Sequence, residues 1–111
     1  MKRLLEPELM QDLWQVRAYS EADFTDSDDC LIRQLAEYLT LIGEELNSKS
    51  LIVDLGCGPG NITQRLSSKW SKSEIIGIDG SKAMLAIARD RSNAKTRKNS
   101  FGRIKYCACD V

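Results

Sequence analysis

The sequence contains no histidine among its 111 residues. This absence excludes Ser-His-Asp and Cys-His nucleophile arrangements and any metal site built with histidine. The four cysteines form no C-x-x-C pair, so we expect no disulfide framework and no metal site, and we place Cys107 and Cys109 in the core. Catalysis would then depend on carboxylates, hydroxyls, backbone groups or a bound cofactor.

The sequence also lacks net charge and long apolar runs. Lysine and arginine total 16, as do aspartate and glutamate, so no overall field favours nucleic acid or an anionic membrane as a partner. No apolar stretch approaches the roughly 20 residues of a spanning helix, and the first residues contain no secretory signal. Together with the cysteine usage, this predicts a reduced, cytoplasmic protein of at most one small domain.

The most informative stretch present is 51–60. A strand-like run, Leu51 to Leu55, leads directly into three glycines at alternate positions, Gly56, Gly58 and Gly60. Glycine permits positive φ and a close approach of the backbone to a ligand. A helical pattern follows at once, and the N–H groups of a first helical turn face the same space. The segment therefore predicts a ligand-binding turn between a strand and a helix.

The apolar periodicities predict a strand-helix-strand-helix-strand order preceded by two helices. Such alternation indicates an α/β fold with a parallel sheet and right-handed crossovers. The apolar, non-alternating strands favour a sheet covered on both faces. The expected helices are about 8–19, 29–47, 61–69 and 82–91, and the expected strands are 51–55, 74–78 and 104–108.

Each predicted strand ends at a candidate ligand contact, and ligands bind at the carboxyl ends of strands in open α/β sheets. Asp79 lies about 20 residues past the first glycine, where a carboxylate accepts bonds from ribose hydroxyls, although it would also suit a strand-end turn. Asp110, with the Val111 backbone beside it, would meet an adenine amine or simply end its strand. Asp54 would order the glycine loop or receive the amino group of an amino-acid ligand, because a buried carboxylate needs partners.

These segments resemble a known family. Asp54-Leu55-Gly56-Cys57-Gly58-Pro59-Gly60-Asn61 resembles motif I of the class I S-adenosylmethionine (SAM)-dependent methyltransferases. Residues 77–85 are similar to the following motif, and 107–111 to the next. The resemblance implies SAM as the cofactor, held by Asp54, Gly56, Cys57, Gly58, Gly60, Asn61, Asp79, Gly80, Met84, Asp110 and Val111.

The same resemblance implies a Rossmann-like, three-layer α/β fold with a parallel sheet, of which this chain supplies strands 1–3 after N-terminal helices. We expect an N-terminal helical extension over 1–47 and the SAM-binding half of a methyltransferase domain over 48–111. The rest of such a sheet would be absent. The strand 51–55 would then present an unpaired edge, which favours self-association or a partner chain.

The function implied is methyl transfer from SAM to an unidentified small-molecule acceptor, with no catalytic residue that can be named. The alternative is a non-catalytic or split-chain fragment that binds SAM or a nucleoside and lacks the acceptor half. A nicotinamide-dependent oxidoreductase is a third interpretation, disfavoured by the G-x-G-x-G spacing and Pro59. Tyr19 and Phe24 would cover the methionine end of the cofactor or serve as ordinary packing residues.

Overall fold

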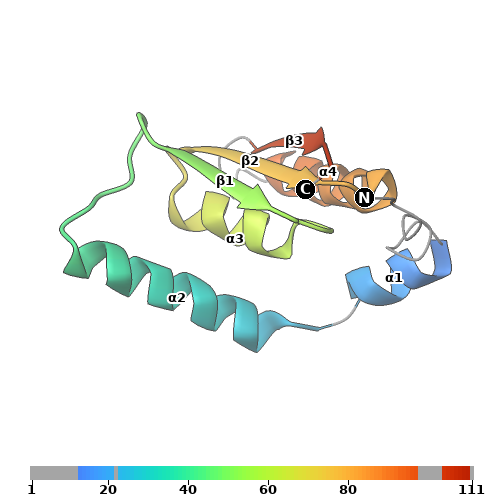
Figure 1. Ribbon diagram of the computed structural model, residues 1–111, viewed down its shortest axis with the longest axis horizontal. Coiled ribbons are helices and arrows are strands. Elements are labelled where there is room, and N and C mark those ends of the chain that lie inside the picture. The colour runs from blue at the N-terminus through green and yellow to red at the C-terminus, as the bar shows by residue number, and fades with distance from the viewer. Residues whose placement is uncertain (1–12, 22, 98–103, 111) are drawn as a thin grey trace.

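The computed structural model describes residues 13–21, 23–97 and 104–110 (Figure 1). Two helices precede an alternation of three strands and two helices, as the sequence predicts. The elements are α1 (Leu13–Glu21), α2 (Thr25–Leu41), β1 (Leu51–Leu55), α3 (Asn61–Lys69), β2 (Glu74–Asp79), α4 (Lys82–Arg97) and β3 (Ile104–Ala108).

The three strands form one parallel sheet in the order β1-β2-β3. The register aligns Asp54 of β1 with Gly77 of β2, and Gly77 with Tyr106 of β3. These three residues therefore form one row across the sheet, just before the carboxyl ends of the strands. The middle residue of this row, Gly77, has no side chain, which leaves room for the side chains beside it.

The helices cover one face of the described sheet. Because β1, β2 and β3 follow one another in the same direction, right-handed crossovers place both α3 and α4 on the same side. The side chains of Leu51, Val53 and Leu55 point to the other side and are 56%, 45% and 67% exposed. None of the described helices covers that face, so the described residues form only two of the three layers that the sequence predicts.

The core lies between the sheet and its helices. Ile32 of α2, Leu66 of α3 and Ile75 of β2 form the buried cluster. Figure 1 shows the corresponding layers, with the sheet over α3 and α2 on the far side of α3. Leu85 and Ala88 of α4 are fully buried. The N-terminal helices therefore pack onto the same face as the crossover helices.

Helix α2 ends earlier than predicted, at Leu41 instead of residue 47. Gly43 adopts a φ of 74°, its N–H donates to the Thr40 carbonyl at 3.1 Å, and the Glu44 N–H donates to the Leu39 carbonyl at 2.9 Å. This is a Schellman motif, which closes a helix on a left-handed glycine. Gly43 was the signal in the sequence for the end of this helix. The predicted helix was too long because apolar residues continue at helical spacing after Gly43.

Helix α4 is longer than predicted and reaches Arg97, because the polar residues after Arg91 remain compatible with a helix. Its start is as expected: the Ser81 hydroxyl accepts the Met84 N–H at 3.2 Å.

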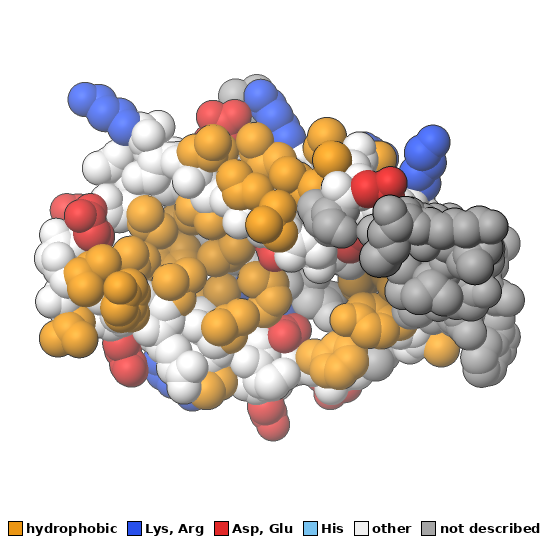
Figure 2. All heavy atoms as spheres, viewed as in Figure 1, with side chains coloured by type: hydrophobic (Ala, Val, Ile, Leu, Met, Phe, Trp, Pro, Cys, Tyr) orange, Lys and Arg blue, Asp and Glu red, His pale blue; other side chains and the backbone are white. Residues whose placement is uncertain are grey.

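Cys107 and Cys109, predicted to be in the core, are exposed: Cys107 belongs to the uncovered face of β3, and Cys109 follows that strand. Figure 2 shows hydrophobic side chains open to view along β1. None of the described helices has the length and apolar character needed to cross a bilayer.

Candidate functional site

The glycine loop between β1 and α3 has the predicted left-handed backbone. Gly56, Gly58 and Gly60 have φ values of 70°, 55° and 88°. The N–H groups of Gly56 and Cys57 both donate to the Ile78 carbonyl, at 2.7 and 2.9 Å. Residues other than glycine rarely adopt such φ values, so the three glycines fix the loop's path. The loop is thereby fastened to the carboxyl end of β2.

The Asp79 carboxylate at the end of β2 holds this loop directly. Its Oδ2 accepts the Gly58 N–H at 2.8 Å, and its Oδ1 accepts the Ser81 N–H at 2.8 Å. A carboxylate offers about four lone-pair sites. Two of these are used inside the protein, which leaves Asp79 with accepting capacity on both oxygens at the edge of the sheet.

Asp54 lies half-buried under the same loop. The Thr63 hydroxyl of α3 donates to its Oδ2 at 2.7 Å. Burial raises the pKa of Asp54 above its usual value, with a smaller upward contribution from the negative charge of Asp79, while the Thr63 bond lowers the pKa. Asp54 therefore ties the end of β1 to the first turn of α3. Its two alternative roles, ordering the loop or receiving an amino group, stay predictions.

Cys57 is not an activated thiol. Its side chain is buried, and burial together with the nearby charges of Asp54 and Asp79 raises the pKa of the thiol to about 12. Because the thiolate is the nucleophilic form, Cys57 is inert at neutral pH. Its sulfur fills space next to Gly77, where an added Cβ would lie 3.0 Å from Sγ.

Tyr106 is a site residue that sequence reasoning missed. Its ring occupies the space left by Gly77, where an added Cβ would lie 2.8 Å from Cδ1. Its hydroxyl forms a 2.7 Å hydrogen bond with the Ser92 hydroxyl and reaches under Gly60. Burial, the largest effect, raises the pKa of Tyr106 to about 12. The signal in the sequence was the glycine in the middle of β2, an unusual residue for a buried strand.

Gly60 differs in role from the other two loop glycines. A Cβ on Gly60 would lie 2.8 Å from the Tyr106 hydroxyl and 3.2 Å from the Ala88 Cβ. In contrast, a Cβ on Gly56 would meet none of the described atoms within 4 Å. Gly60 thus packs the loop onto α4 and β3, whereas the surroundings of Gly56 are open.

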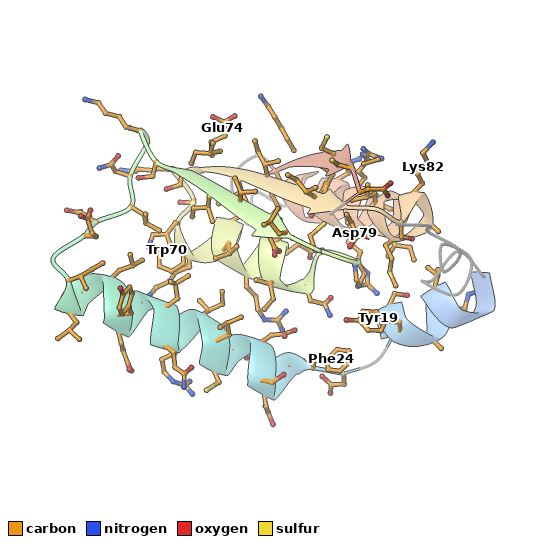
Figure 3. The ribbon with its side chains drawn as sticks, viewed as in Figure 1. Tyr19, Phe24, Trp70, Glu74, Asp79 and Lys82 are labelled. Atoms are coloured by element: carbon orange, nitrogen blue, oxygen red, sulfur yellow. The ribbon has the colours of Figure 1, made fainter. Side chains whose placement is uncertain are left out.

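Tyr19 of α1 lies against the glycine loop. An added Cβ on Gly58 would lie 3.8 Å from Tyr19 Cε1. The Tyr19 ring is 46% exposed, and its centroid lies 5.7 Å from that of the Phe24 ring. Figure 3 shows both rings at the end of the molecule where Asp79 lies, with Trp70 and Glu74 toward the opposite end. The covering role and the packing role of Tyr19 and Phe24 both stay predictions.

The comparison with known sequences decides the family. Residues 52–111, which contain the glycine loop, Asp79 and Asp110, match the protein family described as "Methyltransferase domain". The chain belongs to the class I SAM-dependent methyltransferases. The resemblance recognised from motif I is therefore confirmed.

Curated relatives of this methyltransferase chain are trans-aconitate 2-methyltransferases. The protein from Streptomyces avermitilis is 30% identical over 96 residues, which cover 86% of this chain and 35% of the relative. The Variovorax paradoxus protein is 38% identical over 72 residues, 60% of this chain and 28% of the relative. The chain thus spans about a third of the length of these relatives.

Solved structures confirm the fold class. A SAM-dependent methyltransferase from Clostridium acetobutylicum is similar with a TM-score of 0.58 at 19% identity, covering 93% of this chain and 36% of the other. Coclaurine N-methyltransferase, solved with N-methylheliamine and S-adenosylhomocysteine (SAH), has a TM-score of 0.59 at 16% identity and covers 81% of this chain and 24% of the other. The three-stranded α/β arrangement is thus part of a methyltransferase fold.

The remaining predicted cofactor residues of this methyltransferase chain lie around the same edge. Asn61 begins α3, and Gly80 is half-buried between Asp79 and Ser81. Met84, in the first turn of α4, is only 2% exposed. Asp110 is exposed beyond the end of β3, where the neighbouring Cys109 N–H donates to the Asp79 carbonyl at 2.9 Å. Val111 lies outside the described residues.

The described residues fit a nucleoside-bearing cofactor. An added Cβ on Gly56 would meet none of the described atoms within 4 Å outside its chain neighbours, and one on Gly58 would meet only Tyr19. Asp79 retains accepting capacity beside Gly58. The adjoining first turn of α3 carries N–H groups of the kind that bind anionic groups at helix N-termini. Backbone donors and a carboxylate acceptor therefore lie at one edge of the sheet.

Proposed function

We propose that this chain binds SAM at the carboxyl edge of its sheet and serves methyl transfer to a small-molecule acceptor. The observation that carries the proposal is the bond from the Gly58 N–H to Asp79, which joins the left-handed glycine loop to the expected ribose acceptor. SAM, when bound, supplies an electrophilic methyl group. Positioning the two reactants accounts for much of the rate gain in such transfers.

In this proposal each residue at the edge has a separate task. Asp79 accepts the ribose hydroxyls, and Gly56 and Gly58 let the backbone approach the amino-acid part. Asp54 keeps the loop ordered through Thr63. Asp110 accepts the adenine amine. We assign six further residues to the cofactor site: Cys57, Gly60, Asn61, Gly80, Met84 and Val111.

The charge of the edge supports a cationic cofactor. Asp79 ends β2, Asp110 follows β3, and Asp54 is the last residue but one of β1, so all three lie near this edge. Burial is the main cause of the raised pKa of Asp54, and the negative charge of Asp79 adds to it. A sulfonium ion nearby would favour the ionised form of Asp54, because an opposite charge stabilises a carboxylate.

A small-molecule acceptor is favoured by the relatives, which are named for methylation of trans-aconitate. We extend to this chain only the class of acceptor. We assign neither the acceptor atom of the substrate nor a catalytic base. We also propose that residues 1–47 form a helical extension and that residues 48–111 form the SAM-binding half of the domain.

The test is calorimetric titration of the chain with SAH, comparing Asp79→Asn with Asp90→Asn. Asp90 is an exposed carboxylate in the middle of α4, so the two variants lose the same charge. We expect SAH binding to weaken about tenfold or more in Asp79→Asn, the loss associated with a hydrogen bond to a charged group, and to be unchanged in Asp90→Asn. Equal affinities in both variants would contradict the ribose role, and binding of NAD in preference to SAH would favour the oxidoreductase interpretation.

A second candidate is a SAM-binding fragment that pairs with another chain. The observation that favours it is the outer edge of β1, which pairs with none of the described strands and lies next to the exposed side chains of Leu51, Val53 and Leu55. Unpaired, uncharged edges favour strand addition. Sedimentation at increasing concentration should show association that Val53→Lys abolishes and Leu41→Lys, on the exposed surface of α2, does not. A monomer at all concentrations would exclude this candidate.

A further inference from the structure

Helix α1 is attached to the rest of the molecule near the glycine loop. Val16 and Ser20 are buried in the nine described residues of α1. A helix of this length is marginal by itself in water, so its position depends on tertiary contacts. One side chain of α4 forms a short hydrogen bond to α1.

That side chain is Arg91. Its Nη2 donates to the Ser20 carbonyl at 2.7 Å, and its Nη1 donates to Asn61 Oδ1 at 3.2 Å. Ser20 lies in the last turn of α1, where carbonyl groups lack intrahelical partners and a cation is favourable. Asn61 is the first residue of α3, directly after the glycine loop. One guanidinium group thus connects the end of α1 to the start of α3.

Tyr19 precedes Ser20, so the connection also fixes the position of its ring. The Tyr19 ring lies against Gly58, whose N–H is bound to Asp79. We propose that Arg91 is a positioning residue that fastens α1 to the glycine loop and so holds the ring of Tyr19 over the cofactor site. The inference rests on the proposed function, because Tyr19 contacts SAM only if the cofactor occupies that site.

The geometry requires arginine at this position. The guanidinium group presents several N–H donors in a rigid planar fork and reaches two acceptors on different helices at once. A lysine keeps the charge but offers a compact ammonium group on a flexible stem. Lysine at 91 should therefore keep the charge of the site without fixing α1.

The experiment measures SAH affinity by calorimetry and amide hydrogen exchange in α1 for a set of variants. Arg91→Gln removes the fork, Arg91→Lys retains only the charge, Tyr19→Leu removes the ring and Tyr19→Phe retains it. Arg17→Gln is the matched control, because Arg17 is an exposed arginine of the same helix. We expect Arg91→Gln, Arg91→Lys and Tyr19→Leu to bind SAH roughly tenfold more weakly. Tyr19→Phe and Arg17→Gln should bind like the wild type.

Two readouts separate positioning from general stability. In the chain without ligand, Arg91→Gln should exchange the amides of α1 faster while those of β2 stay protected. Because Arg91 acts through Tyr19, the double variant Arg91→Gln/Tyr19→Leu should bind SAH no more weakly than either single variant. The inference would be overturned if the losses of SAH affinity in the two single variants multiplied in the double variant. It would also be overturned if amide exchange in α1 were the same in Arg91→Gln as in the wild type.

The outcomes also distinguish this inference from the proposed function. A wild-type chain that binds SAH, with Asp79→Asn weakened and Tyr19→Leu unaffected, overturns the inference alone. A wild-type chain that does not bind SAH overturns both. If Arg91→Gln does not fold, the comparison of Tyr19→Leu with Tyr19→Phe decides, because that ring is at the surface.

Discussion

Substituting Gly60 with alanine tests the account of how the glycine loop packs. The φ of 88° imposes left-handed strain of about 1–2 kcal/mol on a residue with a Cβ. The new Cβ would also lie 2.8 Å from the Tyr106 hydroxyl and 3.2 Å from the Ala88 Cβ. Overpacking of this kind costs a further 1–3 kcal/mol, roughly. We therefore expect Gly60→Ala to lower the free energy of unfolding by about 2–5 kcal/mol.

Gly43→Ala is the matched control for the strain alone. Gly43 has a φ of 74°, and an added Cβ there would meet none of the described atoms within 4 Å. This variant should lose about 1–2 kcal/mol. Urea unfolding followed by circular dichroism measures both values, and an unchanged m-value shows that only stability differs.

The decisive comparison adds Tyr106→Phe, which removes the hydroxyl that the new Cβ would approach. In a double-mutant cycle the two substitutions should couple favourably by about 0.5 kcal/mol or more. Additive losses, or a Gly60→Ala variant as stable as Gly43→Ala, would refute the argument that Gly60 is present for close packing.

Three further predictions concern residues of the same site. Because the folded-state pKa of Asp54 is raised, its contribution to stability is present in acid, below the unfolded value of 3.8, and is lost as the pH rises through the folded-state pKa. Asp54→Asn should thus gain stability relative to the wild type as the pH rises above 3.8, measured by urea unfolding, and a pH-independent difference would contradict this. With a thiol pKa of about 12, Cys57 should react with iodoacetamide at pH 8 at least ~100-fold more slowly than the exposed Cys107, as followed by peptide mass spectrometry; equal rates would contradict its burial. Gly77→Ala should destabilise by about 1–3 kcal/mol in thermal unfolding because its Cβ would meet the Tyr106 ring, and a neutral effect would show that the ring moves aside without cost.

The carboxylate of Asp79 gives the site an ordered form before any ligand arrives. Its bonds to the Gly58 and Ser81 N–H groups fix both oxygens from the protein side. Groups held in place in advance reduce the entropy lost on binding. This is why the same residue is central to both the proposed function and the loop geometry.

Much of the arrangement could be predicted from the sequence. The strand 51–55, the left-handed glycines and the strand-end position of Asp79 follow from local backbone preferences and from the rule that parallel strands end at one edge. These features depend on residues close together in the chain, so the sequence alone indicates them. The family followed from the same segment.

Other features depend on contacts between distant segments and were decided only by the tertiary structure. The bonds of Arg91 to Ser20 and Asn61 join three helices, and no local pattern indicates them. The crossovers' direction placed both helices on one face and left the side chains of β1 exposed. The sequence alone therefore determined which residues form the strands, which form the glycine loop, and which lie at the carboxyl edge of the sheet. Only packing in three dimensions decided which side chains support that edge, because burial and hydrogen-bond partners are properties of the assembled chain.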